Sequence, residues 1–497
     1  MIRRILVALL LALLSLSVRG GEVSKVQRYV DSLMATEQFS SVVAGICAEH
    51  ADGRPVVRHG DGKMLVPASN LKLVTTGTAM HELGSSFRFR TELAIVGEIA
   101  DGVLKGDLYI VGGGDPTLFS GDPGAVPEGE LYGRWRAMLA RKGIRKIEGD
   151  IIGDGRFFDG QPEEGSWLYE DIGTYYGTGS DALCYFRNEV DFTAETSAEV
   201  GAALQIAPSY PRLPWMRYTW NCTVGKAGTG DRLYLYTTGD APTGEMRGTL
   251  GKDIRTKKIR CSNKFGAYSC AWMFRNNLVG SGMAVEGKAA YVDMQGFVRT
   301  EPGGEAKRTA AGRAGMEIIG ETSSPELSRI ARITNHRSDN FYAEAIFRML
   351  GKSRTGSASY GASSEAETAA VREMGLDPSA FSPVDGSGLS RKNLVSAGFV
   401  CGFLRAMLAS PSADSFIASL PHPSAKNAGG ADPAVIFYKT GSMDGVRCWS
   451  GYVLPEGKKS EAVAFSLMFN NFTLPSSEIT RQLGIIVGML AEEACGR

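Results

Sequence analysis

Hydrophobic residues recur along the chain with two different spacings, and the first part of the chain is mainly helical in character. Residues 24–33 repeat apolar positions at helical spacing, and the apolar, β-branched run 41–47 precedes an Asp-Gly turn, which predicts a helix and then a strand hairpin. From Ser69 to Leu83 the periodic positions, apolar except for one threonine, again follow helical spacing, and Gly84 supplies a C-terminal cap. Ser69 is therefore predicted to lie at a helix N-terminus.

The pattern changes between about residues 89 and 298. Runs with strand character, such as 90–96, 104–111 and 232–237, are separated by Gly, Asp and Pro turns. This stretch is predicted to be β-rich material inserted between two helical regions. A polar stretch, 302–315, is expected to be a loop or linker that follows it.

Helical spacing then returns, and strands follow near the end. Three predicted helices cover 325–334, 341–350 (closed by Gly351) and 364–374; three strand candidates cover 435–440, 447–453 and 462–469; a last helix lies near 479–492. With a helix and strand at the beginning, this order predicts an α+β core. The two ends of the chain are expected to share one antiparallel sheet.

Length, charge and the N-terminus narrow the class of protein. A chain of 497 residues suggests two to four domains, and its 54 basic and 54 acidic residues are interspersed, which argues against nucleic-acid binding. Residues 1–20 begin with Arg3 and Arg4 and continue with a short apolar run and small residues, as a secretory signal peptide does. No later stretch approaches about 20 apolar residues, so the mature protein is expected to be exported, soluble or peripherally attached.

The cysteines and histidines do not form recognisable metal motifs. The eight cysteines have no CxxC or zinc-type spacing, and no histidine lies in a GxSxG elbow or an HExxH motif. Most cysteines are expected to be buried, and a disulfide among Cys222, Cys261 and Cys270 stays open. No metal or cofactor is predicted.

Three short motifs carry candidate chemistry. They are an SxxK pair (Ser69 and Lys72), the triplet Ser-Asp-Asn at 338–340, and Lys-Thr-Gly-Ser at 439–442. Taken singly, the SxxK pair is more often a helix N-cap with a solvated lysine, and the Ser-Asp-Asn triplet is more often the N-cap of the helix that follows. Together they gain weight, because the first opens a predicted helix, the second immediately precedes one and Lys439 ends a predicted strand.

These motifs resemble those of the class C low-molecular-mass penicillin-binding proteins, the D-alanyl-D-alanine carboxypeptidase/endopeptidases of DacB type. The similarity extends over nearly the whole mature chain and includes family-like blocks at 67–70, 106–109, 113–118 and 385–391. The block at 385–388 is equally consistent with a plain turn. The long interval between Ser69 and Ser338 is also typical of this family.

The resemblance implies a β-lactamase/transpeptidase-like domain, an antiparallel sheet flanked by helices, with two nested β-rich inserted domains. The implied divisions are a signal peptide at 1–20, a catalytic domain at 21–88 and 301–497, inserted domain II at 89–185 and 262–300, and inserted domain III at 186–261.

The resemblance also implies roles for individual residues. Ser69 would be the nucleophile and Lys72 the neutral general base, with the backbone N–H groups of Ser69 and Ser442 stabilising the oxyanion. Ser338 would relay a proton, Asn340 would hold Lys72 or the substrate amide, and Lys439 would supply a fixed positive charge. The substrate-binding residues would be Thr440, Gly441, Ser442 and Asp154.

Asp154 resembles the acid of a DxSxF segment that could pair with the side-chain amine of a stem-peptide diamino acid. Arg156 stands where that pattern has serine, so a purely structural aspartate is the alternative.

The function implied is that of an exported serine D,D-peptidase, periplasmic or cell-envelope associated. It would cleave peptidoglycan stem peptides through an acyl-enzyme on Ser69, and β-lactam antibiotics would inhibit it covalently. The alternatives are a β-lactamase-like or esterase-like hydrolase, and a non-catalytic cell-wall binding protein. The balance between carboxypeptidase and endopeptidase activity stays open.

Overall fold

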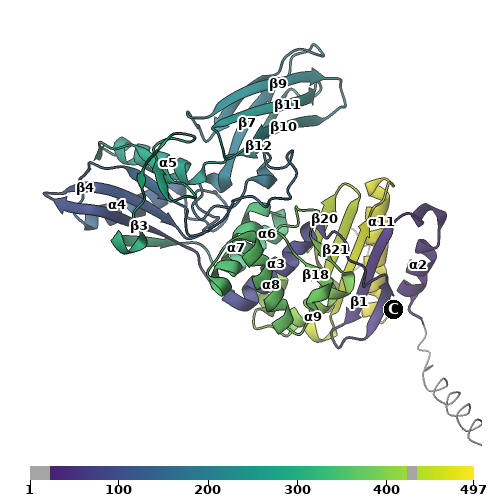
Figure 1. Cartoon of the computed structure of the whole chain (residues 1–497). Helices are drawn as coiled ribbons and strands as arrows, with labels where there is room; N and C mark the ends of the chain where they lie inside the picture. Colours follow the sequence, from purple (N-terminus) through teal and green to yellow (C-terminus); the bar gives the residue numbers. More distant parts are fainter. Residues whose placement is uncertain (1–22, 423–433, 497) are drawn as a thin grey trace, which may run out of the picture.

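The computed structural model describes residues 23–422 and 434–496. The predicted signal peptide lies outside the described residues. None of the helices in these ranges combines the length and apolar character needed to span a bilayer. Figure 1 shows a sheet with helices on both faces, from which a second group of strands and helices extends to one side.

The two ends of the chain meet in one antiparallel sheet. In the described residues its strand order is β2-β1-β22-β21-β20, and β1 pairs directly with β22, with Ile46 opposite Leu467. The prediction that the two ends share a sheet is thus confirmed. The strands are β1 (Val43–His50), β2 (Pro55–His59), β20 (Ala434–Met443), β21 (Val446–Pro455) and β22 (Val463–Asn470).

Helices pack on both faces because successive strand residues point to opposite sides. Phe465 and Leu467 of β22 face a buried cluster that includes Val30 and Ile486, whereas Ala464 and Met468 face the larger core on the other side. The first face is covered by α2 (Lys25–Met34) and α11 (Ser476–Ala494); the second carries α3 (Leu71–Leu83), α6 (Leu327–Arg337), α7 (Asn340–Thr355), α8 (Tyr360–Glu373), α9 (Ala397–Leu408) and α10 (Ala413–Ser419).

Two predicted element ends were wrong. Helix α7 continues past Gly351 and ends at Gly356, which is left-handed; Gly351 instead allows close contact with α8, because a Cβ there would lie 2.8 Å from the Cα of Ser363. Strand β20 does not end at Lys439 but pairs with β21 through Met443, where an Asp-Gly turn reverses the chain.

The inserted elements form three further sheets. The largest has the order β13-β5-β4-β6-β14-β15-β16, with β3 and β17 joined beyond β4; the other two are β10-β11-β9 and β12-β7-β8. The bounds are β3 (Arg90–Ala100), β4 (Val103–Gly112), β5 (Lys146–Ile147), β6 (Ile151–Asp154), β7 (Glu189–Glu195), β8 (Gln205–Tyr210), β9 (Arg217–Gly225), β10 (Asp231–Thr237), β11 (Thr243–Gly251), β12 (Thr256–Ser262), β13 (Ala284–Val285), β14 (Ala289–Val292), β15 (Phe297–Arg299), β16 (Ala306–Thr309) and β17 (Glu317–Ser323); the helices are α4 (Glu128–Arg141) and α5 (Gly266–Gly280). A short pair, β18 (Phe381–Ser382) and β19 (Leu394–Val395), lies elsewhere.

Strands β16 and β17 extend the largest inserted sheet beyond residue 300. Strand β17 pairs with β3 and β16 with β15, so the predicted boundary at 300/301 falls inside this sheet. The predicted polar loop at 302–315 contains β16. Its polar, exposed residues face solvent at a sheet edge, which explains why the sequence there lacks an apolar pattern.

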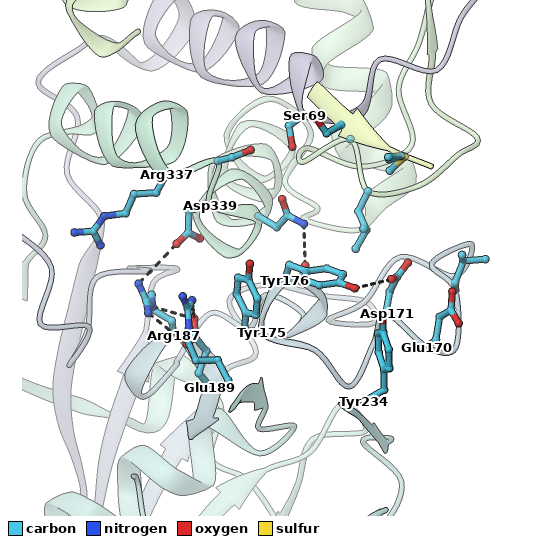
Figure 2. Close-up of a pocket in the computed structure, with 18 of the residues that line it drawn as sticks. Ser69, Glu170, Asp171, Tyr175, Tyr176, Arg187, Glu189, Tyr234, Arg337 and Asp339 are labelled. Atoms are coloured by element: carbon cyan, nitrogen blue, oxygen red, sulfur yellow. Dashed lines mark hydrogen bonds and ion pairs between the residues drawn. The ribbon is translucent and has the colours of Figure 1, made fainter. Parts of the chain in front are cut away.

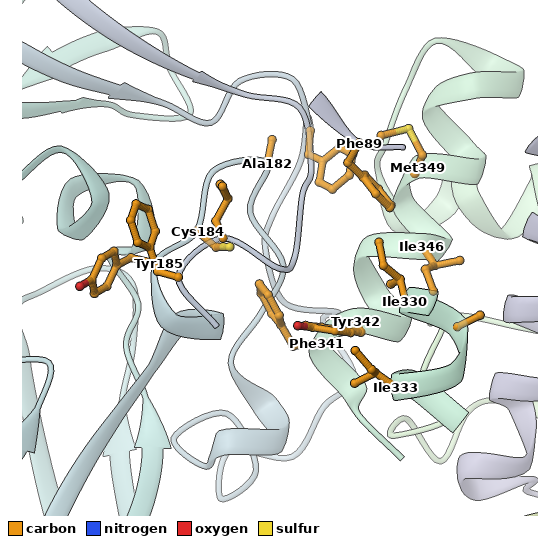
Figure 3. Close-up of a cluster of buried hydrophobic side chains, with 14 of the residues drawn as sticks. Phe89, Ala182, Cys184, Tyr185, Ile330, Ile333, Phe341, Tyr342, Ile346 and Met349 are labelled. Carbon is orange, nitrogen blue, oxygen red and sulfur yellow. The ribbon is translucent and has the colours of Figure 1, made fainter. Parts of the chain in front are cut away.

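A buried apolar cluster joins the inserted elements to the helices beside the five-stranded sheet. Figure 3 shows Phe89, Ala182 and Cys184 facing side chains of α6 and α7, among them Ile330 and Phe341. All of these side chains are almost completely buried. The inserted part is therefore packed against the helical layer rather than merely tethered to it.

The cysteines contribute to these cores as thiols. All eight are free, and seven are buried. The alternative of a disulfide among Cys222, Cys261 and Cys270 is not realised in the structure.

Candidate active site

Ser69 lies in a tight turn, η2 (Ala68–Asn70), that leads directly into α3. The preceding residue, Ala68, is left-handed with φ +46°, a conformation that costs a non-glycine residue roughly 1–3 kcal/mol and often occurs at functional sites. Asn70 fixes the turn by donating from Nδ2 to Ser450 Oγ at 2.6 Å. Ser69 thereby faces a cavity, as Figure 2 shows.

Lys72, one helical turn along α3, is fully buried. Its Nζ lies 3.0 Å from Ser69 Oγ, 2.6 Å from Asn340 Oδ1 and 2.7 Å from the Ser387 carbonyl oxygen. Burial lowers the pKa of Lys72 to about 8, although the nearby carboxylates of Glu344, Asp385 and Asp339 act in the opposite direction. A substantial neutral fraction near neutral pH makes this amine a suitable proton acceptor for Ser69.

Ser338, which also lines the cavity, forms a second serine–lysine pair with Lys439. Ser338 ends α6 in a left-handed conformation, which turns the chain directly into α7. Lys439 donates from Nζ to Ser338 Oγ at 2.9 Å and to the Thr440 carbonyl at 2.6 Å. The sequence motifs thus meet in space, although 101 positions separate this pair.

The surroundings of Lys439 do not support a fixed positive charge. The side chain is buried, and both oxygens that it contacts are neutral. Burial and the neighbouring Lys72 lower the pKa of Lys439 well below its ordinary value. A carboxylate nearby would raise that pKa.

The cavity has a volume of about 750 Å³ and is built from both parts of the chain. Ser69, Ser338, Asn340 and Ser442 line it from the helical layer and β20. The inserted elements contribute side chains that the motifs do not reveal: Leu168, Glu170, Asp171, Tyr175, Tyr176, Arg187, Glu189, Tyr234 and Arg260. Thr440 and Gly441 lie in β20 beside the cavity but outside its lining.

The inserted segment also contacts a motif residue directly. Asn340 donates from Nδ2 to the Tyr176 carbonyl oxygen at 2.9 Å, within the short turn η3 (Tyr175–Gly177). The Tyr176 hydroxyl donates in turn to Asp171 Oδ1 at 3.1 Å. No sequence motif indicated this contact, since it depends on how the insertion folds back.

Asp154 is not brought to the cavity. It lies buried at the end of β6, and Arg156 binds its carboxylate through Nε at 2.9 Å and Nη2 at 2.6 Å. Arg156, the residue that departs from the family pattern, thus binds the carboxylate that the pattern would leave free for a ligand. Asp154 fits the alternative of a structural aspartate.

Gly441 explains how β20 reaches the nucleophile turn. A Cβ at this position would lie 2.6 Å from the Pro67 carbonyl oxygen and 3.0 Å from the Asn70 nitrogen. Only glycine allows the strand to pass this close. The glycine of the third motif is therefore explained by backbone contact.

The fold and these contacts together define the site of a serine hydrolase in which a buried lysine lies beside the candidate nucleophile. The sequence matches the D-Ala-D-Ala carboxypeptidase 3 (S13) family over residues 26–491, and the chain belongs to that family. It is accordingly a serine-type D-Ala-D-Ala peptidase, which favours the main functional prediction over the β-lactamase-like and non-catalytic alternatives.

Individual relatives agree with this assignment. The chain is 28% identical over 482 residues to a D-alanyl-D-alanine carboxypeptidase of Actinomadura sp. (strain R39), which covers 92% of this chain and 83% of that protein. It is 22% identical over 441 residues to the D-alanyl-D-alanine carboxypeptidase DacB of Haemophilus influenzae, and the match covers 86% of this chain and 85% of that protein.

The fold is similar to the crystal structure of penicillin binding protein 4 (dacB) from Haemophilus influenzae. The TM-score is 0.72 at 22% identity, covering 90% of this chain and 94% of that one. The predicted α+β, transpeptidase-like fold is confirmed.

Proposed function

We propose that Ser69 and Lys72 carry out the acylation step on a D-Ala-D-Ala peptide bond. Neutral Lys72 accepts the hydroxyl proton of Ser69 while Oγ bonds to the carbonyl carbon, and the carbonyl electron pair moves to the oxygen. The backbone N–H groups of Ser69 and Ser442 would stabilise this oxyanion. The observation that carries the proposal is the 3.0 Å contact between Lys72 Nζ and Ser69 Oγ inside the cavity.

The second serine–lysine pair would complete the reaction. As the carbon–nitrogen bond breaks, Ser338 gives its proton to the leaving amine and recovers one from Lys439, which lies 2.9 Å away. Water then attacks the ester carbonyl carbon and gives one proton, through Ser338, to Lys439; as the bond to Ser69 Oγ breaks, Lys72 returns its proton to that oxygen, and the peptide acid is released. Asn340 would hold Lys72 or the substrate amide.

The proposed substrates are peptidoglycan stem peptides, and β-lactams would acylate Ser69 as covalent inhibitors. A terminal carboxylate near Lys439, Thr440 and Ser442 would supply the negative charge that makes Lys439 cationic. The presence of penicillin-binding relatives supports this choice. Whether a terminal D-alanine or a crosslink is preferred would depend on the side chains that the insertion places around the cavity.

We further propose that the protein is exported to the periplasm or cell envelope after loss of residues 1–20. The remaining divisions follow the sequence prediction: a catalytic part at 21–88 and 301–497 and inserted parts at 89–185 with 262–300 and at 186–261. The pairing of β16 and β17 with the inserted sheet argues for moving the second catalytic boundary beyond β17.

The test is covalent labelling with a fluorescent penicillin, together with measurement of D-alanine released from a pentapeptide. Wild-type protein should be labelled at Ser69 and release D-alanine, and Ser69→Ala should lose both activities because no hydroxyl is left to acylate. Ser40→Ala, an exposed serine remote from the cavity, is the matched control and should behave like wild type.

Three outcomes would contradict the proposal. One is folded wild-type protein that stays unlabelled, and another is equal labelling of Ser69→Ala. The third is a label that is lost within seconds and accompanied by rapid penicillin hydrolysis, which would indicate a β-lactamase.

A further inference from the structure

A group of buried carboxyl side chains lies behind Lys72, away from the cavity. Glu344 on α7, Asp385 in the loop before β19, and Glu367 on α8 are each at most 1% exposed. None of the three lines the cavity. The acylation chemistry described above uses none of them, so their position beside the general base needs an explanation.

Glu344 holds two consecutive backbone N–H groups. Gly386 donates to Oε2 at 3.0 Å and Ser387 donates to Oε1 at 2.8 Å. The carbonyl oxygen of the same Ser387 accepts from Lys72 Nζ at 2.7 Å. Glu344 is therefore linked to Lys72 through the backbone of a single residue, Ser387.

The loop that carries this carbonyl is fixed by further contacts. Asp385 accepts from the N–H groups of Gly388 and Ser390, each at 2.7 Å, and Thr75 donates from Oγ1 to the Gly386 carbonyl at 2.8 Å. The loop also sits directly on α7, since a Cβ on Gly386 would lie 2.7 Å from the Ala343 carbonyl oxygen.

The contacts of Lys72 decide where its lone pair points. A neutral amine has two N–H bonds and one lone pair, and the Asn340 amide oxygen and Ser387 carbonyl oxygen can only accept. Once both N–H bonds point at these oxygens, the lone pair is left for the third neighbour, Ser69 Oγ. Both acceptors depend on α7: Asn340 directly, and Ser387 through Glu344, one turn further along the helix.

We propose that Glu344 is a positioning residue for acylation: by clamping the Gly386 and Ser387 N–H groups it fixes the carbonyl that aims the lone pair of Lys72 at Ser69. This inference rests on the proposed function of Ser69 and Lys72. Glu344 itself touches neither substrate nor nucleophile.

An electrostatic role and a positioning role of Glu344 predict opposite effects on the acylation rate when its carboxyl group is removed. The charged groups that act on Lys72 are Glu344, Asp385, Asp339 and Lys439; those that act on Glu344 are Lys72 and Asp385, with Glu367 and Tyr360 also nearby. Burial and Asp385 raise the pKa of Glu344 to about 8. When ionised, its carboxylate raises the pKa of Lys72, so by electrostatics alone its removal leaves at least as much neutral Lys72 and makes acylation as fast as in wild type or faster.

The experiment compares the second-order rate constant of acylation by a penicillin across pH for wild type and Glu344→Gln. Glutamine keeps the volume but offers one acceptor oxygen, and its NH₂ group faces the other N–H donor. The rate constant on the high-pH plateau should fall roughly 10- to 100-fold, as expected when a reacting group is misaligned. The pH range over which the rate constant rises toward this plateau should stay the same or move to lower pH.

The matched control is Glu367→Gln. This glutamate is equally buried, but neither of its carboxyl oxygens has a hydrogen-bond partner among the described residues. The plateau of the acylation rate constant should stay within about twofold of wild type, because Glu367 binds neither Lys72 nor the N–H groups of Gly386 and Ser387. Circular dichroism and thermal unfolding establish that each variant is folded.

Glu344→Asp serves as the second variant, because it keeps the carboxylate and should recover part of the plateau lost in Glu344→Gln. A folded Glu344→Gln with a wild-type plateau would overturn the positioning role, and so would faster acylation at every pH. Failure of both variants to fold would also overturn it, since the residue would then be purely structural. Failure of wild type to be labelled at Ser69 would instead remove the proposed function, so the two failures are distinguishable.

Discussion

Lys72 gains its reactivity from the side chains and backbone around it. Its ammonium form would be fully solvated on a surface helix, whereas here the amine is completely buried and contacts three oxygens. Burial disfavours the charged form, and the pKa falls to about 8. About a tenth of the lysine is then neutral at pH 7.

This pKa predicts the pH dependence of acylation. The base must be neutral to accept the Ser69 proton, so the second-order rate constant for penicillin should rise about tenfold per pH unit below about pH 8 and level off above it. A lysine with its ordinary pKa would give a rate that keeps rising beyond about pH 10. Stopped-flow measurements from about pH 6 to about pH 10 check this. A rate that is constant from about pH 6 upward would contradict the assignment of Lys72 as base.

Asp154 shows how one neighbouring residue changes the role of another. In the sequence it looks available to bind a substrate amine, but Arg156 reaches back and forms a two-point ion pair with it. The acids that the insertion brings to the cavity are different residues, Asp122, Glu170, Asp171 and Glu189. Their neighbourhood is set by the fold of the insertion, which no local motif encodes.

At the scale of the element, β20 must pass close to the turn that carries Ser69. Gly441 permits this approach, and a methyl group there would collide with two backbone atoms of 67–70. Gly441→Ala should therefore push the strand away from the nucleophile turn. We expect acylation to slow by roughly tenfold or more, because misplacement of about 1 Å is enough for such a loss.

The control for this substitution is Gly484→Ala on α11. That glycine is exposed in a helix and has nothing within 4 Å of the added Cβ. Alanine there should leave penicillin acylation unchanged and stabilise the protein by up to about 1 kcal/mol. Equal acylation rates in both variants would show that β20 tolerates the displacement.

Helix α7 shows what could and could not be predicted from the sequence. Its apolar spacing predicts a helix from 341, and the observed helix begins one residue earlier, at Asn340, with Asp339 as its N-cap. That the same helix would also place Asn340 against Lys72 and Glu344 against the loop that contacts Lys72 could not be read from the sequence. The partner of Glu344 is a loop more than 40 positions away.

At the scale of the whole molecule, a charge network joins the insertion to the catalytic motifs. Arg187, in a run of left-handed residues, lies 3.8 Å from Asp339 of the second motif and also contacts Asp122 and Glu189. Its side chain is only 12% exposed, and those of its three partners are 10% exposed or less. Without Arg187, Asp122 keeps Arg337 and Glu189 keeps Arg260, whereas Asp339 loses its ion-pair partner; removing one partner of such a buried group is costly.

Arg187→Met should therefore lower the free energy of unfolding by about 3 kcal/mol, measured by urea denaturation. The control is Arg134→Met, which removes the exposed Arg134–Glu130 pair on α4 and should cost no more than about 0.5 kcal/mol. Similar losses in the two variants would mean that the network contributes no more than a surface ion pair.

The sequence by itself determined the elements, the shared sheet and the five motif residues Ser69, Lys72, Ser338, Asn340 and Lys439. These features depend on the spacing of apolar residues and on turn chemistry, which neighbouring residues along the chain specify. Only the tertiary structure decided what surrounds them: the burial that alters both lysines, the clamp of Glu344, the Arg156 pair that occupies Asp154, and the cavity wall supplied by the insertion. Desolvation and long-range contacts depend on the whole packed molecule, so no local pattern can specify them.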